Sequence, residues 1–190
     1  MNVFVLDNFD SFTYNLVHIL EQISDSVIVK RNNQVNINEL VNFDKIVFSP
    51  GPGIPSDVQI MFDILDKYKE TKSILGVCLG HQAIAEYFGA KLANMNEVNH
   101  GREFKTNVIN NHTIFENIPS TFYSGRYHSW IVSQENFPEE LSITSVDENN
   151  RIMSLKHNKY KIHGVQFHPE SIMTPHGKTI LENWIQKRDC

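Results

Sequence analysis

Short apolar runs alternate along the first half of the chain with segments whose apolar residues recur every three or four positions. Apolar runs of four or five residues are typical of strands buried in a parallel sheet. The runs at residues 3–6, 26–30, 45–49 and 74–77 fit this description. Helical periodicity follows each of them, at residues 11–22, 38–43, 58–68 and from residue 79 onward. Strands that alternate with helices predict βαβ units, and so an α/β fold built on a parallel sheet.

The pattern changes after Gly89, where short alternating segments are separated by polar turns. Strands are predicted at residues 104–109, 127–132, 141–146, 152–157 and 161–167, with hairpin turns at residues 147–150 and 157–159. A helix over residues 177–187, with Ser11 as the N-cap of the first helix, completes the prediction. We therefore expect an open, mostly parallel sheet flanked by helices, extended by antiparallel strands, with a small additional antiparallel sheet.

Composition narrows the class of protein. At 190 residues, with 41% hydrophobic and 21% charged residues, the chain is expected to form one domain spanning residues 1–190. A net charge of −5 without a basic run argues against nucleic acid as a partner. The chain has neither a signal peptide pattern nor the ~20 consecutive apolar residues of a membrane span. Two cysteines, Cys78 and Cys190, provide no disulfide framework, and a cytoplasmic protein is predicted.

The candidate nucleophile is Cys78, at the junction of a predicted strand and helix. Glycines flank it in the pattern Gly76-x-Cys78-x-Gly80. This pattern is typical of a nucleophile elbow, a sharp turn too crowded for neighbouring side chains. The following helix points its N-terminal N–H groups at the sulfur, which favours the thiolate, and the Leu79 N–H can face an oxyanion.

The alternative is an inert core cysteine, since free cysteines are among the most buried residues. The two glycines and the polar pair His81-Gln82 favour the nucleophile over this alternative. A nucleophile requires a base elsewhere in the chain.

A second loop, Pro50-Gly51-Pro52-Gly53, follows the predicted strand at residues 45–49. A single Pro-Gly pair is most simply a connecting turn. Doubled at the carboxyl end of a strand, the pair predicts a rigid loop whose Gly53 N–H can approach a ligand, because ligands of open α/β sheets bind at that edge.

Among nine histidines, His168 is the candidate base. Period-two alternation places it on the same side of the chain as Gln166 and, if the backbone stays extended, Glu170. A carboxylate two residues away can hold one imidazole nitrogen and leave the other for the thiol. The remaining expectations are a surface or partly buried His18, core positions for His128 and His163, and exposed positions for His112, His157 and His176.

Three motifs together resemble those of the class I, or triad-type, glutamine amidotransferases: residues 78–82 (CLGHQ), 50–53 (PGPG) and 168–170 (HPE). Residues 7–15 (DNFDSFTYN) and 126–129 (RYHS) resemble, within that family, the small subunit of anthranilate synthase and its relative in 4-amino-4-deoxychorismate synthase. The resemblance spans nearly the whole chain. It implies a flavodoxin-like arrangement of the α/β sheet.

The resemblance implies a role for each matching residue. Cys78 is the nucleophile, His168 the general base and acid, and Glu170 the residue that orients it. Gly53 and Leu79 supply the oxyanion-hole N–H groups. The residues implied to hold L-glutamine are Gly51, Pro52, Gly53, Gln82, Ser129 and Trp130. The family commonly has Leu at the position of Trp130, and Met-His-Gly-Lys where this chain has Asn99-His100-Gly101-Arg102.

The implied function is glutamine hydrolysis that delivers ammonia to a separate chorismate-binding synthase large subunit. The resemblance implies no metal and no cofactor in this subunit. It leaves the pathway open between tryptophan and folate biosynthesis, although residues 168–174 resemble forms that serve both synthases. Two alternatives remain, a stand-alone γ-glutamyl cysteine hydrolase of the same fold and a non-catalytic binding subunit.

Overall fold

The computed structural model describes residues 1–95, 101–110 and 112–186. Asn99, His100, Lys187 and Cys190, which the sequence analysis considered, lie outside the described residues. The helices are α1 (Thr13–Ile23), α2 (Gln59–Tyr68), α3 (Leu79–Tyr87) and α4 (Gly177–Gln186), with short 3-10 turns at Ile37–Asn42, Pro55–Asp57 and Thr113–Phe115. The strands are β1 (Asn2–Asp7), β2 (Ser26–Arg31), β3 (Lys45–Phe48), β4 (Ser73–Val77), β5 (Leu92–Asn94), β6 (Arg102–Val108), β7 (Thr121–Arg126), β8 (Trp130–Val132), β9 (Leu141–Asp147), β10 (Ile152–His157) and β11 (Ile162–Val165).

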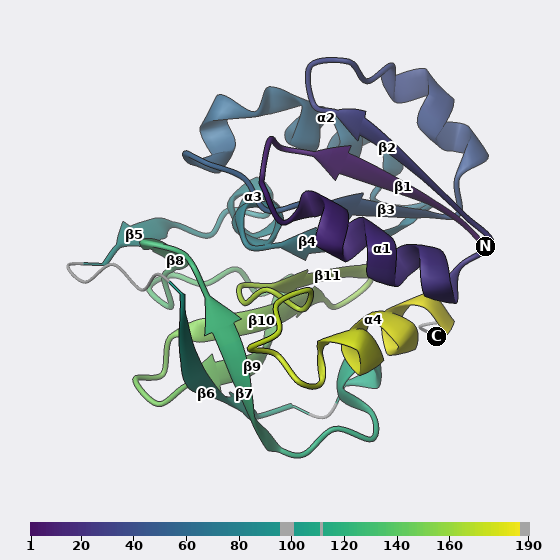
Figure 1. The fold of residues 1–190 in the computed structure, drawn as a ribbon. Helices are drawn as coiled ribbons and strands as arrows, with labels where there is room; N and C mark the ends of the chain where they lie inside the picture. The colour runs from purple at the N-terminus through teal and green to yellow at the C-terminus, as the bar shows by residue number, and fades with distance from the viewer. Residues whose placement is uncertain (96–100, 111, 187–190) are drawn as a thin grey trace.

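One long sheet runs through the molecule in the order β2-β1-β3-β4-β11-β10-β9-β6-β7 (Figure 1). The neighbours from β2 to β11 pair in parallel, and those from β11 to β7 pair antiparallel. Strands β5 and β8 form a separate antiparallel pair. The predicted fold class is confirmed, including the antiparallel extension and the small second sheet.

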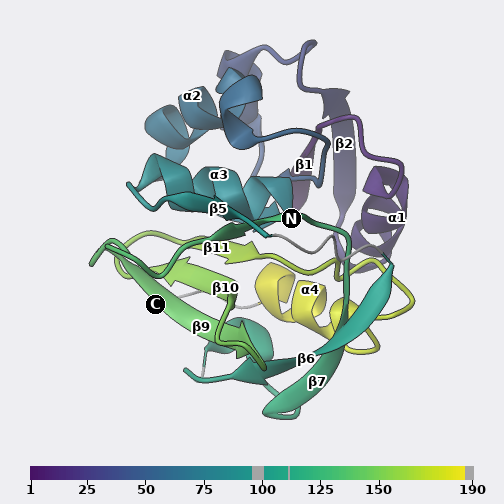
Figure 2. The ribbon, with the colours of Figure 1, turned by 90° about the vertical axis from the view of Figure 1, so that its left-hand side faces the viewer.

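Alternation along the strands builds two hydrophobic cores, one on each face of the parallel half. Val3 and Val5 of β1 pack with α1 and α4, whereas Phe4 and Leu6 pack with α2 and α3. Figure 2 shows α2 and α3 on one side of β1 and β2, with α1 on the other. Because both faces are covered, β3 and β4 are buried along their whole length, as the sequence pattern predicts, whereas β2 at the edge of the sheet is partly exposed.

The prediction of one strand at residues 127–132 is wrong. The chain leaves the large sheet after β7, which pairs with β6, and enters the small sheet at β8, which pairs with β5. The residues between these strands border the candidate active site, as described below. Strand β5 was not predicted because three residues are too few to establish a period.

Two local predictions are also corrected. Ser11 is not the N-cap of α1; Phe12 holds that position without a side-chain cap, because Asp10 Oδ1 instead accepts the Phe12 N–H at 2.7 Å. His157 is buried rather than exposed, since its ring stacks on Tyr160 with centroids 4.4 Å apart and its Nδ1 accepts two backbone N–H groups. His18 is exposed, and His128 and His163 are buried, as expected.

Over residues 1–95, 101–110 and 112–186, no helix combines the length and apolar character that crossing a membrane requires.

Candidate active site

Cys78 sits at the turn between β4 and α3 in a backbone conformation that non-glycine residues rarely adopt. Its φ of 52° and ψ of −100° place it outside the helical and extended regions. Its N–H donates to the Val165 carbonyl of β11 at 2.9 Å, which holds the strained turn in place. Such strain persists only where surrounding structure enforces it, and it concentrates at functional sites. The predicted elbow is present.

The two flanking glycines are required by close approach of the backbone. A Cβ on Gly76 would lie 2.3 Å from the backbone of Gly80, and a Cβ on Gly80 would lie 2.6 Å from the Cβ of Phe48. Helix α3 therefore begins in direct contact with β3 and β4. This packing aims the first N–H groups of the helix, which have no intrahelical acceptor, toward the strand end at Cys78.

His168 and Glu170 come together as predicted, although by a different backbone path. Strand β11 ends at Val165, so Glu170 reaches His168 through a turn at Pro169 and not through continued extension. The Nδ1 atom of His168 lies 2.6 Å from Glu170 Oε1. Both side chains are buried, with 3% and 0% of their surface exposed. A buried hydrogen bond to a carboxylate fixes the imidazole and assigns the proton to Nδ1.

The electrostatic surroundings favour a protonated His168. Burial by itself lowers the pKa of His168, but the Glu170 carboxylate and the Cys78 side chain outweigh it and raise this pKa well above its usual value. The Nε2 atom is buried and makes no hydrogen bond of normal geometry. One ring nitrogen of His168 is therefore bonded to Glu170, and the Cys78 side chain helps to keep the imidazole protonated.

Two aromatic rings enclose the imidazole. Tyr127 packs edge-on against His168 with ring centroids 4.9 Å apart, and Phe12 does so at 6.0 Å. The Tyr127 hydroxyl lies 3.2 Å from the Ser171 hydroxyl, which ties this ring to the loop after the histidine. Sequence reasoning used Phe12 and Tyr127 only as motif positions and did not assign them to the site.

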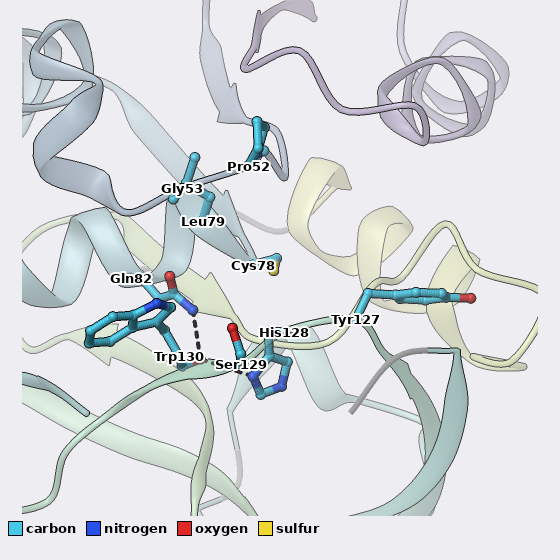
Figure 3. A pocket seen from close by; sticks show the side chains of 10 residues that line it. Pro52, Gly53, Cys78, Leu79, Gln82, Tyr127, His128, Ser129 and Trp130 are labelled. Carbon is cyan, nitrogen blue, oxygen red and sulfur yellow. Dashed lines mark hydrogen bonds between the residues drawn. The ribbon is translucent and has the colours of Figure 1, made fainter. Parts of the chain in front are cut away.

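A cavity of about 150 Å³ adjoins Cys78 (Figure 3). Such a volume is below the roughly 300–1,000 Å³ of sites for drug-sized ligands and suits one small molecule. The figure shows Cys78 between the loop that carries Pro52 and Gly53 and the segment that follows β7. The residues lining it are Gly51, Pro52, Gly53, Cys78, Leu79, Gln82, Tyr127, His128, Ser129 and Trp130. Every residue predicted to bind glutamine or form the oxyanion hole therefore borders this cavity.

The Pro50–Gly53 loop holds its shape through two close approaches. A Cβ on Gly51 would lie 2.6 Å from the Cβ of Asn8, and one on Gly53 would lie 2.8 Å from the Asp57 carboxylate. Gly53 also has a φ of +80°, which favours glycine. The backbone at Gly53 can thus face the cavity without a side chain in between.

Gln82 links α3 to the opposite wall of the cavity. Its Nε2 donates to the Trp130 carbonyl at 2.9 Å, the contact drawn in Figure 3, and to Gln166 Oε1 at 3.1 Å. The same Trp130 carbonyl accepts a hydrogen bond from His128 Nδ1 at 2.9 Å. Because the contact at Trp130 is through the backbone carbonyl, it does not depend on the side chain at this position.

His128 is a lining residue that sequence reasoning placed only in the core. Burial and then the positive charge of Arg126 lower the pKa of His128 to about 3. The ring is therefore neutral at physiological pH, with its proton on the Nδ1 that faces the carbonyl. The sequence signal that could have placed His128 in the site is its position within the motif at residues 126–129.

The described part of the chain contains no group of three or more His, Cys, Asp or Glu side chains arranged to hold a metal ion. The site brings together a strained cysteine, a buried histidine–carboxylate pair and a small cavity edged by backbone. This combination suits attack by a thiolate on a small carbonyl compound, followed by proton transfer through the imidazole.

Comparisons with known proteins agree with this chemistry. Residues 4–187 match the family described as glutamine amidotransferase class-I. The chain is 40% identical to the anthranilate synthase component 2 of Pyropia yezoensis, covering 97% of this chain and 98% of that protein. It is also 40% identical to the aminodeoxychorismate/anthranilate synthase component 2 of Bacillus subtilis, covering 97% and 95% of the two chains.

A solved structure resembles the fold as well. The crystal structure of a glutamine amidotransferase from Thermotoga maritima superposes with a TM-score of 0.77, covering 98% of this chain and 99% of that one, at 12% identity.

Proposed function

The chain belongs to the class I glutamine amidotransferases, and on this basis we propose that it is the glutaminase component of a chorismate-using synthase. It hydrolyses L-glutamine and passes the ammonia to a large subunit that makes anthranilate, 4-amino-4-deoxychorismate, or both. The observation that carries the proposal is the buried His168–Glu170 pair beside the strained Cys78, at the edge of a cavity suited to one small molecule. Full-length relatives with component 2 in their names support the assignment to such a synthase.

In the first half of the reaction, the Cys78 thiolate attacks the side-chain carbonyl carbon of glutamine. The C–S bond forms while the carbonyl electron pair moves to oxygen, and the N–H groups of Gly53 and Leu79 stabilise the oxyanion. Losing one such donor typically raises the barrier by about 3–4 kcal/mol. The imidazolium of His168 then gives its proton to the departing nitrogen, the C–N bond breaks, and ammonia leaves a γ-glutamyl thioester.

In the second half, neutral His168 takes a proton from water as the water oxygen attacks the thioester. The C–S bond breaks, the thiolate and imidazolium are restored, and the product leaves as the γ-carboxylic acid, which becomes glutamate by losing its proton to solvent. Glu170 keeps Nδ1 protonated throughout, so Nε2 is the nitrogen that exchanges protons. These residues account for every proton and electron pair, and the proposal therefore includes no metal or cofactor.

The partner is a chorismate-binding synthase large subunit. Ammonia released into water is protonated and loses its nucleophilicity, so a synthase that consumes it benefits from direct delivery. We propose that the complex works in the cytoplasm, where reducing conditions keep the Cys78 thiol free.

The test is to mix this chain with each candidate large subunit from the same cell and measure glutamine-dependent formation of anthranilate and of 4-amino-4-deoxychorismate. Activation of one large subunit assigns the pathway, and activation of both supports a shared subunit. Glutamine hydrolysis without activation of either would instead support a stand-alone cysteine hydrolase. No hydrolysis under any condition would support a non-catalytic subunit.

A further inference from the structure

Gln166 is a fully buried amide beside the nucleophile that the triad chemistry leaves without a role. It lies just past the end of β11, and none of its surface is exposed. Its Nε2 donates to Cys78 Sγ at 3.6 Å, and its Oε1 accepts from Gln82 Nε2 at 3.1 Å. Both ends of the side chain are therefore engaged.

The direction of these hydrogen bonds follows from one backbone carbonyl. The Trp130 carbonyl can only accept, so Gln82 must present its NH₂ group there. The other hydrogen of that NH₂ group points at Gln166, so Gln166 must accept it through its side-chain oxygen. The NH₂ group of Gln166 is consequently the end that faces the sulfur, and a reversed amide would place two donors against each other.

Packing alone does not explain an amide at this position. Its side chain is completely buried, so the amide has no access to water and depends on partners within the protein. A buried amide without partners is destabilising, and this one is tolerated because its partners are Gln82 and the sulfur. A hydrogen bond to sulfur gains most when the sulfur is anionic, since charge-assisted hydrogen bonds are stronger than neutral ones.

We propose that Gln166 is a positioning residue for Cys78. Its N–H holds the sulfur at the cavity edge and stabilises the thiolate before attack. Through Gln82, the same amide connects the nucleophile to the Trp130 backbone on the far wall of the cavity. The expected effect of Gln166 on glutamine hydrolysis rests on the proposed function. Its effect on the reactivity of the Cys78 sulfur does not, because that reactivity can be measured without glutamine.

The experiment uses the full chain in a Cys190→Ser background, where Cys78 is the only thiol, and measures alkylation by iodoacetamide across a range of pH. Gln166→Met keeps length and packing but removes the donor, whereas Gln166→Asn keeps an amide that is one methylene too short. Both variants should slow alkylation near neutral pH by about 10- to 100-fold, the range for a hydrogen bond to a charged group. The pH profile of alkylation should move to higher pH, because loss of the donor disfavours the anionic sulfur.

Thr106→Val is the matched control, because it removes a buried hydroxyl that bonds Ser124 at 2.8 Å in β6 and β7, outside the site. It should lower the melting temperature without changing alkylation. In the complex with its large subunit, both Gln166 variants should lower kcat for glutamine more than they change KM.

Alkylation rates and pH profiles of both variants equal to those of the parent would overturn the proposal and leave Gln166 a structural residue. If the chain showed no glutaminase activity, the alkylation result would still decide the role of Gln166, so the two failures are distinguishable.

Discussion

His168 and Glu170 form a 2.6 Å hydrogen bond across a single intervening residue, and both side chains are buried. The intervening Pro169 prevents continued strand pairing, so the chain turns and brings the carboxylate back against the ring. A carboxylate held this close keeps the imidazole in one tautomer and one orientation.

Replacing this carboxylate should impair catalysis more than binding. Glu170→Gln should lower kcat for glutamine by about 10²-fold, the lower end of what general acid–base catalysis contributes, with little change in KM. Because Glu170 raises the pKa of His168, the variant should also shift the pH profile of kcat/KM to lower pH. Steady-state kinetics over a pH range measures both. The exposed Glu148→Gln is the control, and a rate equal to the parent's would reduce the triad to a Cys–His dyad.

Cys78→Ser should abolish the release of ammonia from glutamine but not the use of ammonia by the large subunit. In the complex, glutamine-dependent synthesis should be lost, while synthesis from ammonium salts should continue, since the sulfur acts only on glutamine. Product formation from each nitrogen source at saturating chorismate measures the difference. Equal loss with both nitrogen sources would show that Cys78 has a structural role in the whole complex. It would contradict the proposal that Cys78 acts only in glutamine hydrolysis.

Gly80→Ala should destabilise the protein even though alanine is the better helix former. Helix propensity favours alanine by about 1 kcal/mol, but the added methyl would lie 2.6 Å from the Phe48 Cβ. Overpacking of this kind typically lowers the free energy of unfolding by about 1–3 kcal/mol, so the close contact should prevail. Urea unfolding measures the change.

The comparison variant is Glu21→Ala, at an exposed position of α1 where alanine is also the better helix former. It should change stability far less than Gly80→Ala. An increase in stability for Gly80→Ala would show that α3 and β3 separate easily and that the elbow is not tightly held.

The buried histidines should make the protein sensitive to acid. Burial is the main cause that lowers the pKa values of His81 and His128 to about 3. The unfolded pKa is about 6.5, so between about pH 3 and pH 6.5 the unfolded chain binds more protons than the folded one. The free energy of unfolding should therefore fall on acidification through this window, by up to about 1.4 kcal/mol per pH unit for each histidine.

His168 should act in the opposite direction, because its pKa is raised on folding. Its stabilising contribution is complete below about pH 6.5 and is lost as the pH rises through the raised value. Urea titrations at several pH values test both slopes. His81→Leu should flatten the acid slope, and an unchanged slope would show that His81 is protonated in the folded protein.

The sequence by itself determined the α/β class and the elbow at Cys78, and it singled out His168 and Glu170 as a pair. Apolar runs such as residues 74–77 predict buried strands because both faces of a parallel sheet are covered, and this holds for any packing of the helices. The spacing of Gly76, Cys78 and Gly80 predicted a close approach of backbones, since only glycine leaves room for one. These signals are local and can be recognised along a single segment.

Only the tertiary structure decided how distant segments meet. The switch of the chain from β7 to β8 depends on two different partner strands, so the local pattern at residues 127–132 could not reveal it. The aromatic contacts of Phe12 and Tyr127 with His168, and the amide chain through Gln166, join residues far apart in sequence. Their geometry depends on side-chain packing in three dimensions, which periodicity along one strand or helix does not encode.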